Sequence, residues 1–172
     1  VVGRLVGNTA LATEGSTSSM INLLINLFIG FSVGANVLVA RFHGAGRDDE
    51  VNETVHTAIT LSMISGIFLL ILGVTLTRTL LIWMGSPDDV LDQSSLYLKI
   101  YFLAMPATLL YNFGSSILRA VGDTKRPLFF LIISGVLNAG LNLFLVVVFH
   151  MGVAGVGIAT VISQMVSCVL VL

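Results

Sequence analysis

The chain has 172 residues, of which 56% are hydrophobic and 10% charged, and its formal net charge is −1 at pH 7. A soluble domain carries about 25% charged residues, so this chain has too few to cover a surface that faces water. The composition excludes a soluble domain and a basic nucleic-acid-binding surface, and the mean hydropathy of +1.01 predicts a membrane protein.

Five stretches long enough to cross a bilayer follow one another along the chain. A span needs about 20 mostly apolar residues, and the longest run without Asp, Glu, Lys or Arg, from Pro127 to Leu172, has room for two. Backbone groups in lipid must pair within their own segment, so each span is expected to be a helix. The sequence predicts an all-α, multi-pass transmembrane bundle forming a single domain over residues 1–172. The predicted spans lie near residues 17–41, 54–83, 93–118, 127–149 and 155–172.

Neither end of the chain has the features of a natural terminus. The sequence shows no initiator Met and no signal peptide, and it stops within an apolar run. We interpret residues 1–12 as the end of a preceding span and the chain as a fragment of a larger bundle.

The basic residues between the spans indicate an orientation. Arg41 and Arg47 flank the first connection, and Arg119, Lys125 and Arg126 flank the third, whereas the second and fourth have no Lys or Arg. By the positive-inside rule, the first and third connections are predicted to face the cytoplasm.

Local signals mark a kink and a turn. Pro106 lies in the middle of the third predicted span, where it removes a backbone donor and favours a kink. Gly122 is suited to a left-handed helix end, Asp123 or Thr124 can cap the next helix, and Pro127 suits its first turn.

Four of the five spans carry uncharged polar residues along one face. At about 100° per residue, the members of each set fall within an arc of roughly 60° to 100°. The sets are Asn22, Asn26 and Asn36 in the first span; Tyr97, Tyr101, Thr108, Asn112, Ser115 and Arg119 in the third; Ser134, Asn138 and Asn142 in the fourth; and Thr160, Ser163, Gln164 and Ser167 in the fifth.

Two interpretations of these polar faces remain open. They can line a hydrated cavity that carries a solute, or they can join helices through interhelical hydrogen bonds. The sequence has no Ser/His/Asp or Cys/His set and no pair of carboxylates at membrane depth. We therefore expect a protein that is not an enzyme and needs no cofactor.

Three groups of residues resemble one family of membrane proteins, the multidrug and toxic compound extrusion (MATE) transporters. They follow in the family's order and are separated by full spans, so the resemblance covers essentially the whole chain. The matching segments are Leu27–Asn36 with Arg41–Gly46, Leu118–Pro127, and Asn138–Asn142 with Gly152–Thr160 and Ser163-Gln164.

The resemblance implies twelve spans in two six-helix lobes, of which this chain would supply spans two to six of the first lobe. It implies export of drugs or other organic cations across the plasma (inner) membrane by antiport against Na⁺ or H⁺. The implied partners are the substrate, the coupling cation, the lipid bilayer and the second lobe of the same protein.

The resemblance also implies a polar pocket at positions that match Tyr97, Asn112, Asn138 and Asn142. The helical periodicity selects the same four residues independently, and Thr160 and Gln164 of the fifth span complete the candidate set for substrate or ion binding. Some family members have Asp where this chain has Asn142, so the carrier of the coupling ion is not visible in the sequence.

Two rival functions are weighed against this one. A flippase for lipid-linked oligosaccharides, from the same wider superfamily, would need several Arg or Lys in its cavity, and only Arg119 lies on a polar stripe. In a membrane scaffold that transports nothing, the amides would only join helices.

Overall fold

The described part of the chain is almost entirely helical. The structure, a computed structural model, describes residues 8–83 and 88–172. Within these ranges it has no strand, which confirms the all-α prediction. The elements are α2 (Asn8–Gly44), α3 (Asp48–Trp83), α4 (Asp88–Leu103), α5 (Met105–Ala120), α6 (Lys125–Leu143), the short π-helix η1 (Phe144–Val148) and α7 (Gly152–Val171).

The helices extend past the runs that predicted them. α2 begins at Asn8 rather than near residue 17, and α3 begins at Asp48 rather than near residue 54. A charge-free run marks only the part of a helix that can lie in hydrocarbon, and polar residues beside it continue the helix into water. α2 therefore includes residues 8–12, which the sequence assigned to a preceding span, whereas residues 1–7 lie outside the described part.

Four of the described helical segments are long and apolar enough to cross a membrane. They are Asn26–Gly44, Asp48–Thr79, Lys125–Val148 and Gly152–Val171. The third predicted span differs because it consists of two helices, α4 and α5, of 16 residues each. At about 1.5 Å per residue neither reaches the roughly 30 Å of a hydrocarbon core, but together they cover it.

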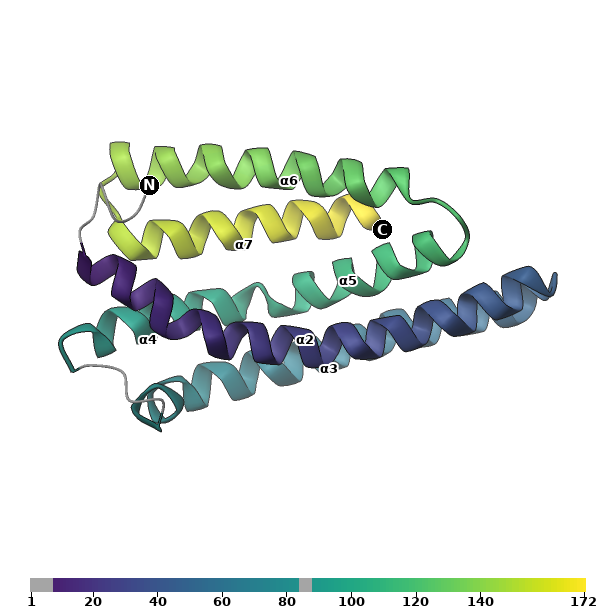
Figure 1. Cartoon of the computed structure of the whole chain (residues 1–172), viewed down its shortest axis with the longest axis horizontal. Coiled ribbons are helices and arrows are strands. Elements are labelled where there is room, and N and C mark those ends of the chain that lie inside the picture. The colour runs from purple at the N-terminus through teal and green to yellow at the C-terminus, as the bar shows by residue number, and fades with distance from the viewer. Residues whose placement is uncertain (1–7, 84–87) are drawn as a thin grey trace.

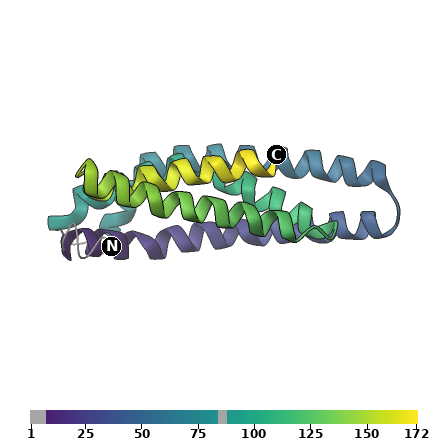
Figure 2. The same cartoon turned by 90° about the horizontal axis from the view of Figure 1, so that it is seen from above.

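The interrupted span lies at the centre of the bundle. α4 and α5 follow one another between the α2–α3 pair and the α6–α7 pair, and they contact both pairs (Figure 1). α2 and α3 form a long hairpin that projects beyond the other helices (Figure 2). A change in the direction of α4 or α5 would therefore affect the helix pairs on both sides.

Two glycines of α3 let the interrupted span approach closely. A Cβ built on Gly66 would lie 2.5 Å from the Cα of Pro106, and one built on Gly73 would overlap the ring of Phe102. Phe102 is fully buried, and the break between the two helices falls at Ala104, two residues before the proline. The structure thus contains the predicted break in the third span and shows that Gly66 and Gly73 of α3 pack against it.

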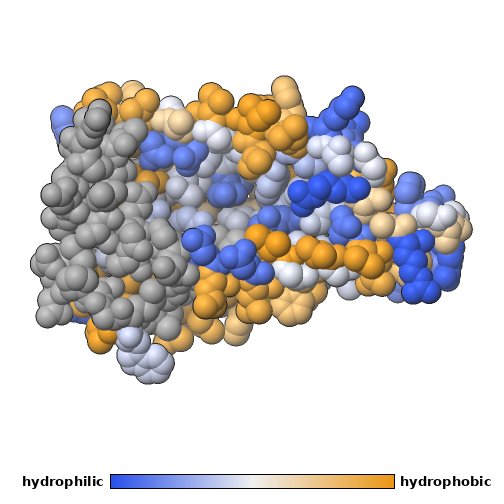
Figure 3. All heavy atoms as spheres, viewed as in Figure 1, coloured by the Kyte–Doolittle hydropathy of each residue, from blue (hydrophilic) through white to orange (hydrophobic). Residues whose placement is uncertain are grey.

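The outer surface is apolar where lipid is expected. On α6 the side chains of Leu128, Phe129, Ile132 and Val136 are more than half exposed. Figure 3 shows hydrophilic side chains gathered at the projecting end of the α2–α3 hairpin. An apolar exterior of this extent would be unstable in water, so the chain is part of a multi-pass membrane protein.

The connections alternate between the two ends of the bundle. The α2–α3 and α5–α6 connections lie at the same end, and the α6–α7 connection lies at the other (Figure 1). Gly122 has a φ of +88°, as predicted for a left-handed helix end, and Asp123 Oδ1 accepts a hydrogen bond from the backbone N–H of Arg126 at 3.2 Å. This arrangement is compatible with the predicted orientation, which stays a prediction.

Candidate functional site

A hydrogen-bonded chain of polar side chains joins α6 to α7. Asn138 and Asn142 lie one turn apart on α6, and Asn142 Nδ2 donates to Asn138 Oδ1 at 2.9 Å. Asn138 Nδ2 in turn donates to Ser163 Oγ on α7 at 3.0 Å. Helical periodicity places the two amides on one face, and the packing of α6 on α7 supplies the serine. We call Asn138, Asn142 and Ser163 the amide cluster.

One atom of the amide cluster is left without a partner. Asn142 Oδ1 is buried and accepts no hydrogen bond from any residue that the structure describes. An unsatisfied buried acceptor is unfavourable by about 1 to 3 kcal/mol, so such atoms are rare and each calls for an explanation, such as a bound water, a bound ion or a functional role. Chemically, this oxygen can accept a hydrogen bond from a ligand or coordinate a cation.

The backbone of α6 changes form directly after this residue. The π-helix η1 begins at Phe144, two residues after Asn142, and such π-turns frequently mark functional sites. The sequence contains no proline or glycine there that would predict the change. This is one feature of the site that sequence reasoning missed.

Thr160 and Gln164 lie on α7 beside the amide cluster. Ser163 Oγ donates to the carbonyl oxygen of Thr160 at 2.9 Å, and Thr160 Oγ1 donates to the carbonyl of Val156 at 3.0 Å. Gln164 is half-buried and forms no hydrogen bond with the described residues. The amide cluster is thus bonded to the backbone of Thr160 but not to its hydroxyl, and the amide of Gln164 stays available among the described residues.

Tyr97 approaches α7 from the central span. It is buried on α4, with its ring centroid 6.2 Å from that of Tyr101. A Cβ built on Gly157 of α7 would lie 2.9 Å from Ile100 Cγ2 and 3.6 Å from Tyr97 Cδ2. The small residue lets α4 pack closely against the turn of α7 that precedes Thr160.

Asn112 is not joined to the amide cluster by any hydrogen bond. Its Nδ2 donates to the carbonyl of Thr108 in its own helix at 2.9 Å. The six candidates thus lie on four helices: Tyr97 on α4, Asn112 on α5, Asn138 and Asn142 on α6, and Thr160 and Gln164 on α7. None of the six lines the wall of any of four pockets found in the described part of the chain.

A second polar network joins α2 to α5. Asn36 Nδ2 donates to the carbonyl of Ser116 at 2.6 Å, Ser116 Oγ lies 3.3 Å from Ser32 Oγ, and Arg119 donates to Ser116 Oγ at 3.2 Å. These are the contacts expected of polar residues that join helices. The polar faces of the first and third predicted spans thus contribute in part to packing.

Removing the Asn36 side chain is expected to weaken the bundle without touching the amide cluster. Asn36→Ala should lower the free energy of unfolding by about 0.6 to 2 kcal/mol, because an interhelical hydrogen bond in a membrane protein has that magnitude. Thermal unfolding of the full-length protein in detergent measures the change. Asn26→Ala is the matched control, since Asn26 is exposed on the same helix and forms no hydrogen bond with described residues.

The chain matches the family model described as MatE over residues 1–144. It is 34% identical over 166 residues to the probable multidrug resistance protein YoeA of Bacillus subtilis (strain 168), covering 94% of this chain and 36% of the relative. The match thus spans just over a third of the length of that relative.

Two solved structures share the fold. The inward-facing conformation of a multidrug resistance MATE family transporter of the MOP superfamily matches with a TM-score of 0.92 and 24% identity, over 97% of this chain and 38% of that one. The outward-facing conformation of such a transporter matches with a TM-score of 0.93 and 25% identity, over 99% and 38%. By its sequence match and its helical arrangement, this chain belongs to the MATE family of membrane transporters.

Proposed function

We propose that the protein to which this chain belongs exports drugs or other organic cations across the membrane by antiport against a cation. The observation that carries the proposal is the buried, unpaired Asn142 Oδ1 within the amide cluster. An amide oxygen without a donor at this depth is suited to bind a transported cation or a donor group of the substrate.

The two asparagines of the amide cluster, together with Thr160 and Gln164 beside it, favour Na⁺ over H⁺ as the ion held at this position. Asn138, Asn142, Thr160 and Gln164 supply neutral oxygen atoms, which can coordinate Na⁺, but none of these side chains titrates. If H⁺ is the coupling ion, the acid that carries it lies elsewhere in the protein. Among the described residues, no group of three His, Cys, Asp or Glu side chains could hold a metal ion.

Alternating access supplies the mechanism. The chain resembles inward-facing and outward-facing transporters about equally, with TM-scores of 0.92 and 0.93. This is expected if the bundle moves as one body against a second lobe and exposes the same site to each side in turn. Competition between ion and substrate for the polar site would then couple their movements.

Flux through reconstituted vesicles tests this proposal. The full-length protein should move tetraphenylphosphonium, an organic cation, against its gradient when an opposing Na⁺ or H⁺ gradient is imposed. Collapsing the gradient with an ionophore should stop the movement. Flux no greater than that of protein-free vesicles would instead support a scaffold, and flux of lipid-linked oligosaccharides alone would support a flippase.

A further inference from the structure

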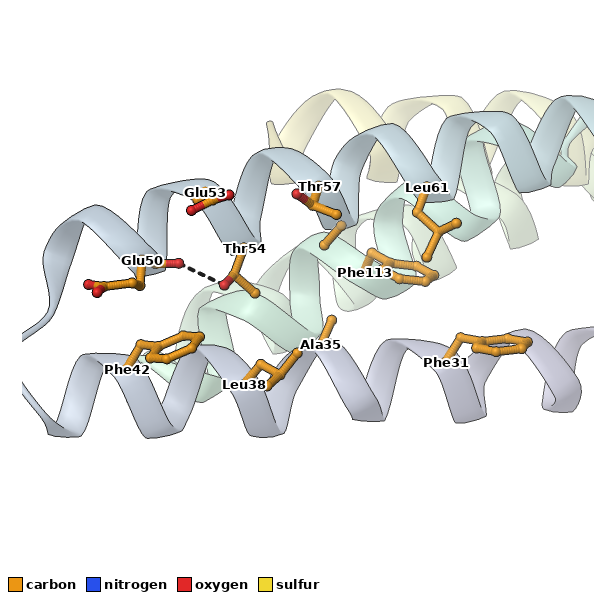
Figure 4. A pocket seen from close by; sticks show the side chains of 11 residues that line it. Phe31, Ala35, Leu38, Phe42, Glu50, Glu53, Thr54, Thr57, Leu61 and Phe113 are labelled. Carbon is orange, nitrogen blue, oxygen red and sulfur yellow. Dashed lines mark hydrogen bonds between the residues drawn. The ribbon is translucent and has the colours of Figure 1, made fainter.

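A pocket of about 390 Å³ opens between α2 and α3 near their connection. Figure 4 shows α2 on one side, α3 on the other, and Phe113 of α5 behind them. No residue of its wall lies on α6 or α7, so the pocket is separate from the amide cluster. Its wall consists of Phe31, Ala35, Leu38, Phe42, Glu50, Glu53, Thr54, Thr57, Ala58, Leu61 and Phe113.

The wall combines aromatic rings with carboxylates. Three phenylalanines and two leucines offer an apolar surface, and two glutamates are its only charged residues. Glu50, Glu53, Thr54, Thr57 and Leu61 lie on a single face of α3, because at about 100° per residue they fall within an arc of roughly 100°. The pocket is therefore acidic at one end and apolar along the rest of its length.

The two glutamates are not equivalent. Glu50 forms an ion pair with Arg47, whose guanidinium carbon also lies 5.4 Å from the centroid of the Phe42 ring. The charge of Glu50 is thus balanced within the protein. Glu53 is exposed and forms no ion pair with any residue in the described ranges, so its negative charge remains available to a ligand.

We infer that this pocket is a second binding site, which takes amphiphilic organic cations at the end of the bundle where α2 joins α3. The positive group of the ligand would pair with Glu53, and its apolar body would lie against the exposed side chains of Phe31, Leu38 and Leu61. Aromatic faces attract cations and repel anions, which adds to the preference set by the carboxylate. The volume is within the range of roughly 300 to 1,000 Å³ of small-molecule sites.

The site extends the proposed export function by giving the substrate a position at one end of the bundle, outside the amide cluster. An acyl chain of a phospholipid is the rival occupant, since it would also fit an apolar groove. It would need neither the glutamate nor the aromatic rings. Charge selectivity therefore separates the two occupants.

Equilibrium dialysis of the full-length protein with two probes of equal shape and opposite charge tests the inference. Tetraphenylphosphonium is the cation, and tetraphenylborate is the matched anion. The variant Thr57→Trp places a large side chain in the pocket from an exposed position. The difference in bound probe between the unmodified protein and this variant therefore measures binding to the pocket. We expect that contribution for the cation and not for the anion.

Glu53→Gln should weaken this contribution about three- to tenfold, which is the effect of losing one partly exposed charge beside aromatic rings. Asp49→Asn is the matched control: it removes an exposed carboxylate from the first turn of the same helix, outside the pocket wall, and should leave binding unchanged. An equal loss of cation binding in both variants would mean that only the general negative potential near the α2–α3 connection attracts the cation. That result would overturn the inferred binding site.

Two further outcomes would also overturn the inference. One is that Thr57→Trp removes no tetraphenylphosphonium binding. The other is that it removes both probes equally and added phospholipid displaces them, which would assign the pocket to a lipid. Vesicle flux keeps this test separate from the proposed function. Binding to the pocket without flux would support the pocket as a binding site and contradict the export function. Flux without binding to the pocket would support export and contradict the pocket as a binding site.

Discussion

Asn142→Ala is expected to lower coupled export at least tenfold while changing the free energy of unfolding by no more than about 1 kcal/mol. The two effects have different causes. Export should fall because the variant loses the unpaired Oδ1, and a hydrogen bond or contact to a charged partner contributes about 1.5 to 3 kcal/mol, which corresponds to more than tenfold in affinity. Stability should change little because the lost hydrogen bond to Asn138 is offset by the removal of a buried, unsatisfied acceptor.

This pairing of effects distinguishes a binding residue from one that only joins helices. Initial rates of ion-driven tetraphenylphosphonium flux in vesicles give the first quantity, and thermal unfolding in detergent gives the second. Asn36→Ala is the matched control, because Asn36 is also an amide at a helix interface but its Nδ2 donates to a partner on α5. It should show the opposite pattern, with lower stability and a preserved ion dependence.

The interpretation of Asn142 would be wrong if its alanine variant exported normally with unchanged ion dependence. It would also be wrong if the variant lost as much stability as Asn36→Ala, because the Asn142 side chain would then serve mainly to stabilise the packing of the helices. Asn138→Ala gives an independent check, since Asn138 holds Asn142 on one side and Ser163 on the other. We expect it to reduce export as well, with a larger loss of stability.

Gly66→Ala should be among the most destabilising single changes in the chain, with a loss of about 1 to 3 kcal/mol. The added Cβ would lie 2.5 Å from Pro106 Cα and 3.1 Å from Pro106 N, and these are backbone atoms that cannot rotate away. Either α3 must move outward or the break between α4 and α5 must change its direction. Since α4 and α5 both contact α7, the displacement should spread through the bundle.

Gly135→Ala is the control for the general effect of replacing a helical glycine. A Cβ at Gly135 would meet no atom within 4 Å, so the change should be neutral or stabilising by up to about 1 kcal/mol through helix propensity. Melting temperatures of the two full-length variants in the same detergent make the comparison. Equal melting temperatures would show that the approach of α3 to the kinked span is not a tight constraint.

The class of fold follows from the sequence because a bilayer allows few solutions. A chain with long charge-free runs must pair its backbone within each segment, so the runs Pro127–Leu172 and 54–77 could only become helices. The break near Pro106 follows equally from one local fact, the missing N–H of proline. Helix ends were less predictable, because hydropathy reports where lipid can lie and the helix continues beyond that point.

The candidate site was predictable only in part. A period of 3.6 residues places Asn138 and Asn142 on one face of their helix whatever that helix contacts. It says nothing of the neighbour, so it could not show that Asn138 bonds to Ser163, that Asn36 bonds to Ser116, or that Asn112 bonds only within its own helix. The α2–α3 pocket was equally hidden, because Phe113 reaches it from a helix distant in the sequence.

The sequence by itself determined that this protein is a bundle of membrane helices with polar faces, since composition and periodicity are properties of the chain alone. Only the tertiary structure decided which polar faces meet and which atoms remain unpaired. The physical reason is that a hydrogen bond needs two groups at about 3 Å, and the packing of whole helices determines that distance. The same packing gives Asn36 Nδ2 an acceptor on α5, whereas it leaves Asn142 Oδ1 without a donor among the described residues.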